Sequence, residues 1–508
     1  MKAKRSILNL IFGMASMLIT VALGIIIPRM FLVHFGSEVN GLISSIGQII
    51  IYLSLLEAGV GAASLQALYK VVARADKQDI NEVLSATHNY YQKTGLYYFL
   101  CVIVMAVLYP LFVHSSISWP TTMSVVLLTG LGGAFNYYFQ GTYTIFVAAI
   151  GKSYINTIIT TTINILSSIA KIVLIKLGYN VVIIQGSFFA LTMFQIVIYL
   201  IYIKRNYKWL DLKSRPNFQS ISQKNSVMIH QLSTLIFNNT DVLILTFFTN
   251  LKVVSVYVIY NMLFTVIDRV IGTVNDSITF ALGQTFYDNK KRFIMMFDTY
   301  EVYFMAFVFS FYAVAYILVL PFMRLYTSGI KDINYIDFWL PVLFVTLKLL
   351  SNARTPSNNL INIAGHFKKT QYRSILESSI NIVCSLIFVH YLGMYGVLMG
   401  TIAALLYRSI DMIVYANQTI LDRNPWPTIR RWLTDVLIFL LIIFVASKIN
   451  INPHSYLHVI GWACLLSLLV IPIYLVLSSL SERNVYKYAR QLMIENMKKI
   501  KKRVGAQS

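Results

Sequence analysis

The sequence has few acidic residues and few cysteines, and both shortages exclude classes of function. Only 20 of its 508 residues are Asp or Glu, against 42 Lys and Arg. Its three cysteines, Cys101, Cys384 and Cys464, stand alone in apolar runs, which predicts neither a disulfide framework nor a cysteine metal site. The eight histidines are scattered as well, so no metal centre is expected.

Long hydrophobic runs are what the sequence has instead. Hydrophobic residues make up 57% of the chain, far more than in a soluble protein of this length. Many separate runs can cross about 30 Å of hydrocarbon, which predicts an all-α polytopic membrane protein with about 14 spans. We expect the first run to stay as a span, because it is too long for a cleaved signal peptide. The predicted spans are 7–27, 39–67, 94–113, 121–147, 153–175, 180–203, 227–249, 253–282, 294–323, 336–363, 372–390, 393–417, 432–448 and 456–478.

The formal net charge of +22 has a topological interpretation. Most of the basic residues fall between spans or beyond the last one, notably in 204–224 and 483–503. The positive-inside rule assigns these segments and both termini to the cytoplasm. Membrane lipids with anionic headgroups are therefore expected partners, and nucleic acid is not.

An internal repeat divides the spans into two halves. The segment 151–179 contains GKSY, INI and LGY, and the segment 365–395 contains GHFK, INI and LGMY in the same order. Such a repeat predicts two pseudo-symmetric six-helix lobes followed by two additional helices. The predicted parts are an N-terminal lobe at 1–203, a cytoplasmic linker at 204–226, a C-terminal lobe at 227–417, the two additional spans at 418–480 and a basic cytoplasmic tail at 481–508.

Ionisable residues at membrane depth are the candidate functional residues. Glu57 lies in the second span, and a carboxylate at that depth normally faces a bundle interior or a wet cavity. The tenth span carries Lys348, Arg354 and, around Pro356, a run of Ser, Thr and Asn. Such a stretch cannot face lipid, so it lines a hydrated cavity or is buried in protein, and we favour the cavity.

A cavity lined by arginine and lysine suits an anion, and phosphate in particular. Asn, Ser and Thr beside it would match sugar hydroxyls. Glu57 and Asp241 could neutralise unpaired arginines, bind a coupling cation (H⁺ or Na⁺) or carry a proton; no other cofactor is expected. The predicted substrate-binding residues are Arg29, Arg269, Lys348, Arg354 and Asn358.

Several of these residues also carry a family resemblance. The runs FGSEVNGL from Phe35, LSLLEAGVG around Glu57, NTDVLI around Asp241 and AGHF from Ala364 together resemble Wzx-type polysaccharide flippases. These belong to the multidrug/oligosaccharidyl-lipid/polysaccharide (MOP) superfamily, and the resemblance covers most of the chain up to about residue 420. It implies a V of two lobes around a cavity that opens alternately to each side.

The resemblance also implies a substrate, an undecaprenyl-pyrophosphate-linked oligosaccharide. Such a flippase moves its substrate from the inner to the outer leaflet of the bacterial cytoplasmic membrane, for capsule or related surface polysaccharide. A polysaccharide polymerase and its chain-length machinery would be further partners. The first span lacks a close match to the arginine-rich first span of peptidoglycan-precursor flippases, which argues against a peptidoglycan role.

Two alternatives stay open. A MATE-like, cation-coupled exporter of small molecules should have an acidic cavity, whereas four of the six charged candidate residues named above are basic. A membrane glycosyltransferase or polymerase needs a large extramembrane segment with catalytic carboxylates, but the predicted loops are short. No Walker loop, dinucleotide fingerprint, HExxH motif or nucleophile elbow is present. The sequence therefore favours a transporter over an enzyme.

Overall fold

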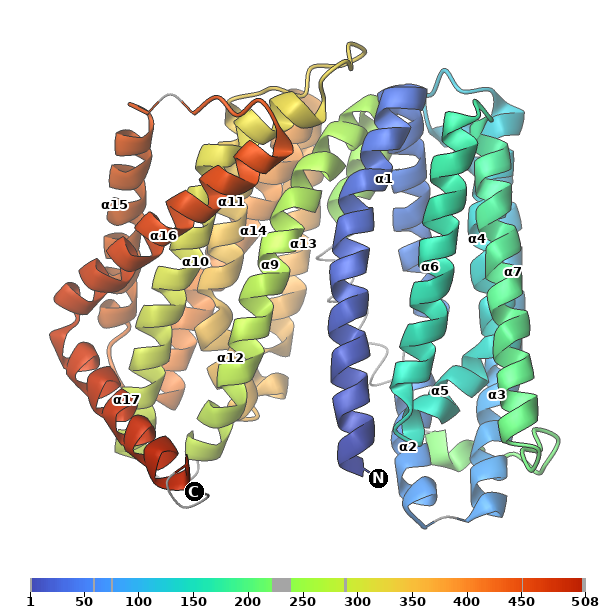
Figure 1. Cartoon of the computed structure of the whole chain (residues 1–508), viewed down its shortest axis with the longest axis horizontal. Coiled ribbons are helices and arrows are strands. Elements are labelled where there is room, and N and C mark those ends of the chain that lie inside the picture. The colour runs from blue at the N-terminus through green and yellow to red at the C-terminus, as the bar shows by residue number, and fades with distance from the viewer. Residues whose placement is uncertain are drawn as a thin grey trace. The chain divides into compact units, whose positions relative to one another are not determined.

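The computed structural model of the chain is built from helices, and the residues it describes contain no strand. These residues are 2–57, 60–74, 76–221, 239–286, 290–449 and 451–504. Nine helices within them are long and apolar enough to cross a membrane, by length and composition. Together with shorter helices they follow the predicted spans in order, as an all-helical multi-pass membrane protein (Figure 1).

One predicted span falls largely outside the described residues. This is the seventh, 227–249, whose described part is the helix Asn239–Phe248. The predicted linker 204–226 is described up to residue 221.

The chain divides into two compact units, which we describe separately. Unit 1 comprises Met1–Ile259 and Gly329–Ile333, and unit 2 comprises Tyr260–Ser328 and Asn334–Ser508. The helix α9, Leu251–Phe286, contributes residues to both units.

Unit 1 contains the helices of the first six predicted spans. Its core is formed by apolar residues of α1, α3, α4 and α7, among them Leu42, Ala106, Val125 and Ile184. α1 bends at Gly36, whose φ of +81° lies in the left-handed region that glycine adopts without a steric penalty. This bend separates the first two predicted spans. The elements are α1 (Lys2–Leu53), η1 (Ser54–Leu56), α2 (Val60–Arg74), α3 (Lys77–Phe112), α4 (Trp119–Phe135), the π-helical turn η2 (Asn136–Gln140), α5 (Gly141–Ala149), α6 (Ser153–Lys176), α7 (Val181–Asn206) and η3 (Phe218–Ile221).

Unit 2 is packed around α10, the most buried of the nine membrane-length helices. α10 contacts α11, α15 and α16, while α13 and α14 form a closely packed pair. The segment predicted as a basic tail is helical as far as Val504. After α9, the elements are α10 (Lys290–Tyr326), α11 (Trp339–Ala353), α12 (Thr355–Ile363), α13 (Phe367–Leu392), α14 (Met394–Tyr415), the π-helical turn η4 (Ala416–Ile420), α15 (Trp426–Ala446), α16 (Tyr456–Ser481) and α17 (Arg483–Val504).

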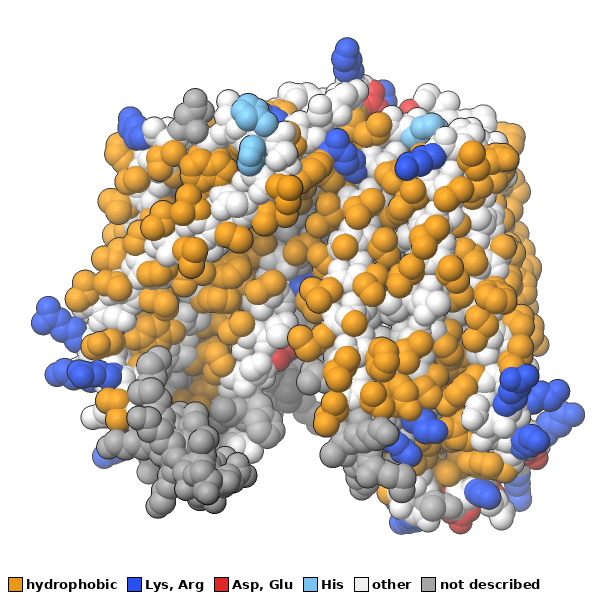
Figure 2. Space-filling view, in the orientation of Figure 1, with side chains coloured by type: hydrophobic (Ala, Val, Ile, Leu, Met, Phe, Trp, Pro, Cys, Tyr) orange, Lys and Arg blue, Asp and Glu red, His pale blue; other side chains and the backbone are white. Residues whose placement is uncertain are grey.

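The surface has the polarity of a membrane protein. Figure 2 shows hydrophobic side chains over the middle of the helices, with Lys and Arg gathered toward the helix ends. Large apolar side chains such as Val104, Leu166, Leu441 and Leu468 are exposed on these faces. Exposed apolar surface of this extent marks contact with lipid.

The segments paired by the sequence repeat share their turn geometry. Gly151 and Gly178, which precede and follow α6, have φ values of +75° and +78°. Gly365 and Gly393 flank α13 in the same way, with φ values of +70° and +54°. Corresponding glycines therefore reverse the chain at corresponding places in the two halves.

Candidate functional site: charged clusters and a cavity near interrupted spans

The fourth and tenth predicted spans are both interrupted helices, and they occupy corresponding positions in the two halves. The fourth span consists of α4, the turn η2 and α5, and the tenth consists of α11 and α12, with Arg354 at the junction. Pro356 lies in the first turn of α12 and cannot donate a backbone hydrogen bond. Interrupted spans in matching positions are a pointer to the binding site of a transporter.

The first charged cluster in unit 2 joins α9 to α11. The Lys348 Nζ donates to Asp268 Oδ2 over 2.8 Å, and Asn352 Nδ2 donates to Asp268 Oδ1 over 3.2 Å. The Tyr312 hydroxyl, from α10, donates to the same carboxylate. Next to Asp268 is Arg269, whose side chain is exposed and makes no ion pair or hydrogen bond with the rest of the described chain. Lys348 and Asp268 therefore balance each other's charge in this cluster.

The second cluster begins at the junction of α11 and α12. Arg354 pairs with Glu377 on α13, and Arg408 on α14 lies with its Nε 3.3 Å from Glu377 Oε2. Arg408 Nη1 also reaches Asp411 Oδ2 over 2.7 Å, and Arg373 pairs with Asp411. Counted over the described residues, three guanidinium groups face two carboxylates, which gives one excess positive charge. Since arginines keep their charge even when buried, this excess is permanent.

Polar residues of α12 extend the tenth span's network. Asn359 Nδ2 lies 2.7 Å from Asn275 Oδ1, 3.0 Å from Thr279 Oγ1 and 3.0 Å from the Tyr300 hydroxyl oxygen. The predicted site residue Asn358 is half-buried, and its backbone N–H donates to the Arg354 carbonyl over 2.8 Å. Asn359, which the sequence reasoning did not single out, is thus the residue that binds α12 to α9 and α10.

Unit 1 contains a cavity of about 420 Å³ beside the fourth span. Its wall combines one carboxylate, several tyrosines and amide side chains. An aromatic and amide-rich wall suits a polar ligand with apolar faces. The polar residues that line it include Glu57, Tyr91, Tyr98, Tyr137, Gln140 and Gln195.

Glu57 is held in that cavity by the packing around it. It follows η1, where the second span is interrupted, and it accepts a hydrogen bond from the Tyr91 hydroxyl of α3. A Cβ atom at Gly61 would overlap the Glu57 carboxylate and lie 3.0 Å from the Tyr91 hydroxyl oxygen. Only glycine at position 61 therefore leaves room for this carboxylate–tyrosine pair.

The other two predicted residues of unit 1 lie elsewhere in that unit. Arg29 is half-buried on α1. Asp241 is buried and accepts a 2.8 Å hydrogen bond from the Tyr257 hydroxyl of α9. Its neighbour Thr240 lies 2.8 Å from the Tyr52 hydroxyl of α1. Asp241 is therefore part of a polar contact between the seventh span, α1 and α9.

The structure thus pairs Lys348 with Asp268, the neighbour of Arg269 on α9, and it joins Arg354 to a separate cluster. Glu377 and Tyr91 are central partners that the sequence did not place at a site. Their sequence signal is limited to a carboxylate and a tyrosine inside apolar runs. Among the residues described, no group of three or more His, Cys, Asp or Glu is arranged to hold a metal ion.

Known structures share this fold. A structure of the lipid II flippase MurJ in an inward closed conformation has a TM-score of 0.70 and 14% sequence identity, and the match covers 94% of this chain and 100% of that one. An inward-facing multidrug resistance MATE family transporter of the MOP superfamily has a TM-score of 0.64 and 16% identity, over 78% and 94% of the two chains. A MOP superfamily transporter from Pyrococcus furiosus has a TM-score of 0.54 and 16% identity, over 83% and 97%.

No family model matches the sequence, and no curated protein does either. At these identities the structural matches establish the fold alone: the chain has the fold of MOP superfamily transporters.

Proposed function

We propose that this protein flips a lipid-linked oligosaccharide across the bacterial cytoplasmic membrane by alternating access, with both termini in the cytoplasm. The substrate class is a polyprenyl-pyrophosphate-linked repeat unit, such as the undecaprenyl-linked precursors of capsule or related surface polysaccharide. The activity is transport, not catalysis. A polysaccharide polymerase and its chain-length machinery would act on the product.

The observation that carries this proposal is the excess of positive charge beside the tenth span. Arg354 belongs to a cluster in which, among the described residues, cations outnumber carboxylates by one, and Lys348 lies on the same span. Membrane-embedded charge is costly and is normally retained for function. An anionic pyrophosphate group could be bound there by Lys348, Arg269 and Arg354, with the carboxylates exchanging partners as it enters and leaves.

A role in coupling is proposed for the carboxylates of unit 1. Glu57 lines a cavity and accepts a hydrogen bond from Tyr91, so a proton or Na⁺ could bind there and leave again. Asp241, which is bonded to Tyr257, would balance charge at the seventh span. The 14% identity to a lipid II flippase and the 16% identity to a MATE transporter are too low to decide the substrate, so the arrangement of charge supports the proposal.

Deletion of the gene tests the class of function. Lipid-linked repeat units should then accumulate on the cytoplasmic leaflet, where externally added glycosidases cannot reach them. Absence of assembled repeat units would instead indicate an enzyme of their synthesis. Accumulation of a small toxic compound, with normal surface polysaccharide, would favour the MATE-like alternative.

Single substitutions test the site. Lys348→Gln and Arg354→Gln should each lower export by about tenfold or more, because a charge-assisted contact to phosphate is lost. Asp268→Asn should preserve export, because it removes the competing carboxylate from Lys348. Equal loss in Lys348→Gln and Asp268→Asn would show that the pair is merely structural. Arg430→Gln, which removes an exposed arginine elsewhere in unit 2, is the matched control and should export normally.

A further inference from the structure

The described part of the predicted linker is folded onto unit 1. The Ser85 Oγ donates to the Ser214 carbonyl over 2.7 Å, and the Asn217 N–H donates to the Glu82 carbonyl over 3.1 Å. The Asp211 N–H donates to Asn81 Oδ1 over 3.1 Å. These bonds attach residues 211–217 to α3 at several points, so the segment has a defined conformation there.

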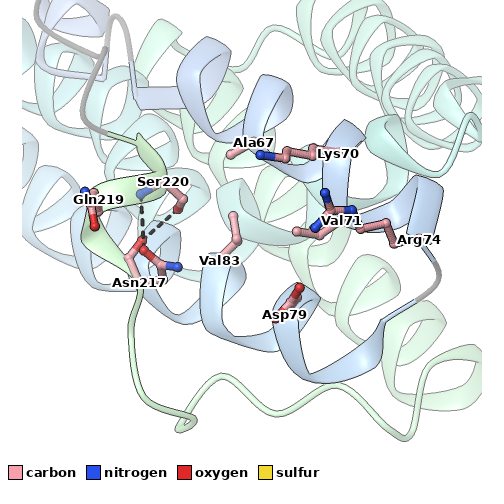
Figure 3. A pocket seen from close by; sticks show the side chains of 9 residues that line it. All are labelled: Ala67, Lys70, Val71, Arg74, Asp79, Val83, Asn217, Gln219 and Ser220. Carbon is pink, nitrogen blue, oxygen red and sulfur yellow. Dashed lines mark hydrogen bonds between the residues drawn. The ribbon is translucent and has the colours of Figure 1, made fainter.

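This docked segment closes one side of a pocket of about 360 Å³. Figure 3 shows the side chains of Lys70 and Arg74 extending from α2 over the pocket, with α3 below and the η3 turn on the other side. Asn217 and Ser220 are linked by two hydrogen bonds, of 3.2 Å and 2.7 Å, which shape that turn. The lining residues are Ala67, Lys70, Val71, Arg74, Asp79, Val83, Asn217, Gln219 and Ser220.

The two cations of the pocket are available to a ligand. Lys70 and Arg74 are four residues apart on one face of α2, and both are exposed. Asp79 lines the same pocket, but neither cation forms an ion pair with it, and no other carboxylate of the described residues pairs with them. The pocket therefore offers two cations to an incoming anion.

The remaining lining residues indicate which other chemical groups the anionic ligand has. Asn217, Gln219 and Ser220 offer amide and hydroxyl groups opposite the cations, while Ala67, Val71 and Val83 are apolar. Tyr69, next to Lys70, is 53% exposed, as is typical of aromatic side chains at a membrane interface. Cations, hydroxyl-binding groups and apolar contacts together match a phosphodiester with a polyol headgroup and acyl chains.

We propose that this pocket binds the headgroup of an anionic glycerophospholipid. The phosphate lies between Lys70 and Arg74, and the headgroup hydroxyls bind Asn217, Gln219 and Ser220. The site is separate from the charged clusters of unit 2 and does not depend on the flippase proposal.

Equilibrium binding to the full-length protein in detergent tests the site. Dioctanoyl phosphatidylglycerol is the probe, and dioctanoyl phosphatidylcholine and glycerol 3-phosphate are the comparison ligands. The double variant Lys70→Gln/Arg74→Gln should weaken phosphatidylglycerol binding about tenfold or more. Asp79→Asn should tighten phosphatidylglycerol binding, because it removes a carboxylate that repels the lipid phosphate. A purely structural role for these residues would not produce opposite shifts.

The matched control is Lys208→Gln/Lys213→Gln, which removes two exposed cations of the docked segment that do not line the pocket. This control variant should bind dioctanoyl phosphatidylglycerol with unchanged affinity. If phosphatidylglycerol binding is weakened equally in both double variants, the effect is due to general surface charge and the proposal is overturned. Equal binding of phosphatidylcholine would overturn it as well. Glycerol 3-phosphate binding as tightly as phosphatidylglycerol would overturn the lipid as the ligand. Unchanged unfolding midpoints of the variants would exclude misfolding as the cause.

Discussion

In the part of the chain that the structure describes, helices of unit 1 are joined by hydrogen bonds such as those below, while helices in unit 2 are also joined by networks of ion pairs. In unit 1 the contacts include Tyr109 to Ser45 at 2.9 Å and Asn40 to Ser255 at 2.8 Å. In unit 2 one network joins α11–α12, α13 and α14, and another joins α10, α15 and α16. The two units have the same kind of helical packing but different polar chemistry.

This difference determines how each unit responds to change. A hydrogen bond between neutral groups contributes modestly, and its loss leaves a group that small rearrangements can satisfy. A buried ion pair contributes little by its presence, but removing one partner leaves an uncompensated charge away from water. The stability of unit 2 should therefore be most sensitive to substitutions that remove a charge, and that of unit 1 to substitutions that change side-chain volume. The predictions that follow test this contrast, from the largest expected effect to the smallest.

The largest effect is expected at the network between α10 and α15. Arg431 pairs with Asp298 at 2.7 Å and with Glu301, and Glu301 is 2% exposed. Arg431→Met should lower the free energy of unfolding by roughly 3–5 kcal/mol, because Glu301 loses its arginine. Thermal unfolding of the purified protein in detergent measures this change.

Two variants sharpen that measurement. Arg430→Gln, which removes an exposed arginine that pairs with Glu482, should cost less than about 1 kcal/mol, because Glu482 keeps Arg431 as a partner. Adding Glu301→Gln to Arg431→Met should recover part of the loss, since the unpaired charge is then removed. If the double variant is no more stable than Arg431→Met, packing and not charge sets the stability of this network.

An intermediate effect is expected from added volume in unit 1. Gly61→Ala should destabilise the protein by roughly 1–3 kcal/mol, because the new methyl group overlaps the Glu57 carboxylate. Gly47→Ala on α1 is the matched control: nothing lies within 4 Å of its Cβ position, so it should be neutral or stabilising by about 0.5–1 kcal/mol. Glu57→Ala added to Gly61→Ala should restore stability. Equal costs for the two glycine variants would contradict the role assigned to Gly61.

The sequence predicted the class of fold, but it did not predict the side-chain partners of the candidate residues. Apolar length was enough to predict the spans, because it depends on local composition. Partner choice depends on the rotation of each helix about its axis, and adjacent residues point about 100° apart. The pairs Tyr90–Tyr91 and Asn358–Asn359 illustrate this limit.

In each pair, the two residues have the same chemistry, and nothing local distinguishes them. The structure aims Tyr91 at Glu57, while Tyr90 packs against Phe218 with ring centroids 5.7 Å apart. It likewise binds Asn359, and not Asn358, to Asn275 and Tyr300. For the same reason the sequence could not predict the ion pairs of Lys348 with Asp268 and of Arg354 with Glu377, because the partners lie on different helices.

The smallest effect concerns pH, at the turn before α13. The Lys369 Nζ lies 3.2 Å from His366 Nε2, and the Tyr415 hydroxyl lies 3.0 Å from His366 Nδ1. Partial burial, and then the charge of Lys369, lower the pKa of His366 below its ordinary value of 6.5. A lysine ammonium can only donate, so this contact needs Nε2 to be an unprotonated acceptor.

Since the folded-state pKa is the lower one, the unfolded chain binds a proton first as pH falls. The contribution of His366 to stability is therefore complete above the unfolded pKa and is lost as pH falls through it toward the folded pKa. Unfolding midpoints measured from about pH 7.5 to about pH 5.5 should show a small decrease that His366→Gln abolishes. Lys369→Gln should also reduce the decrease, because the repulsion that lowers the pKa is gone. A decrease of the same size in both variants would assign the pH dependence to other groups, and ion pairs would remain the feature that distinguishes unit 2.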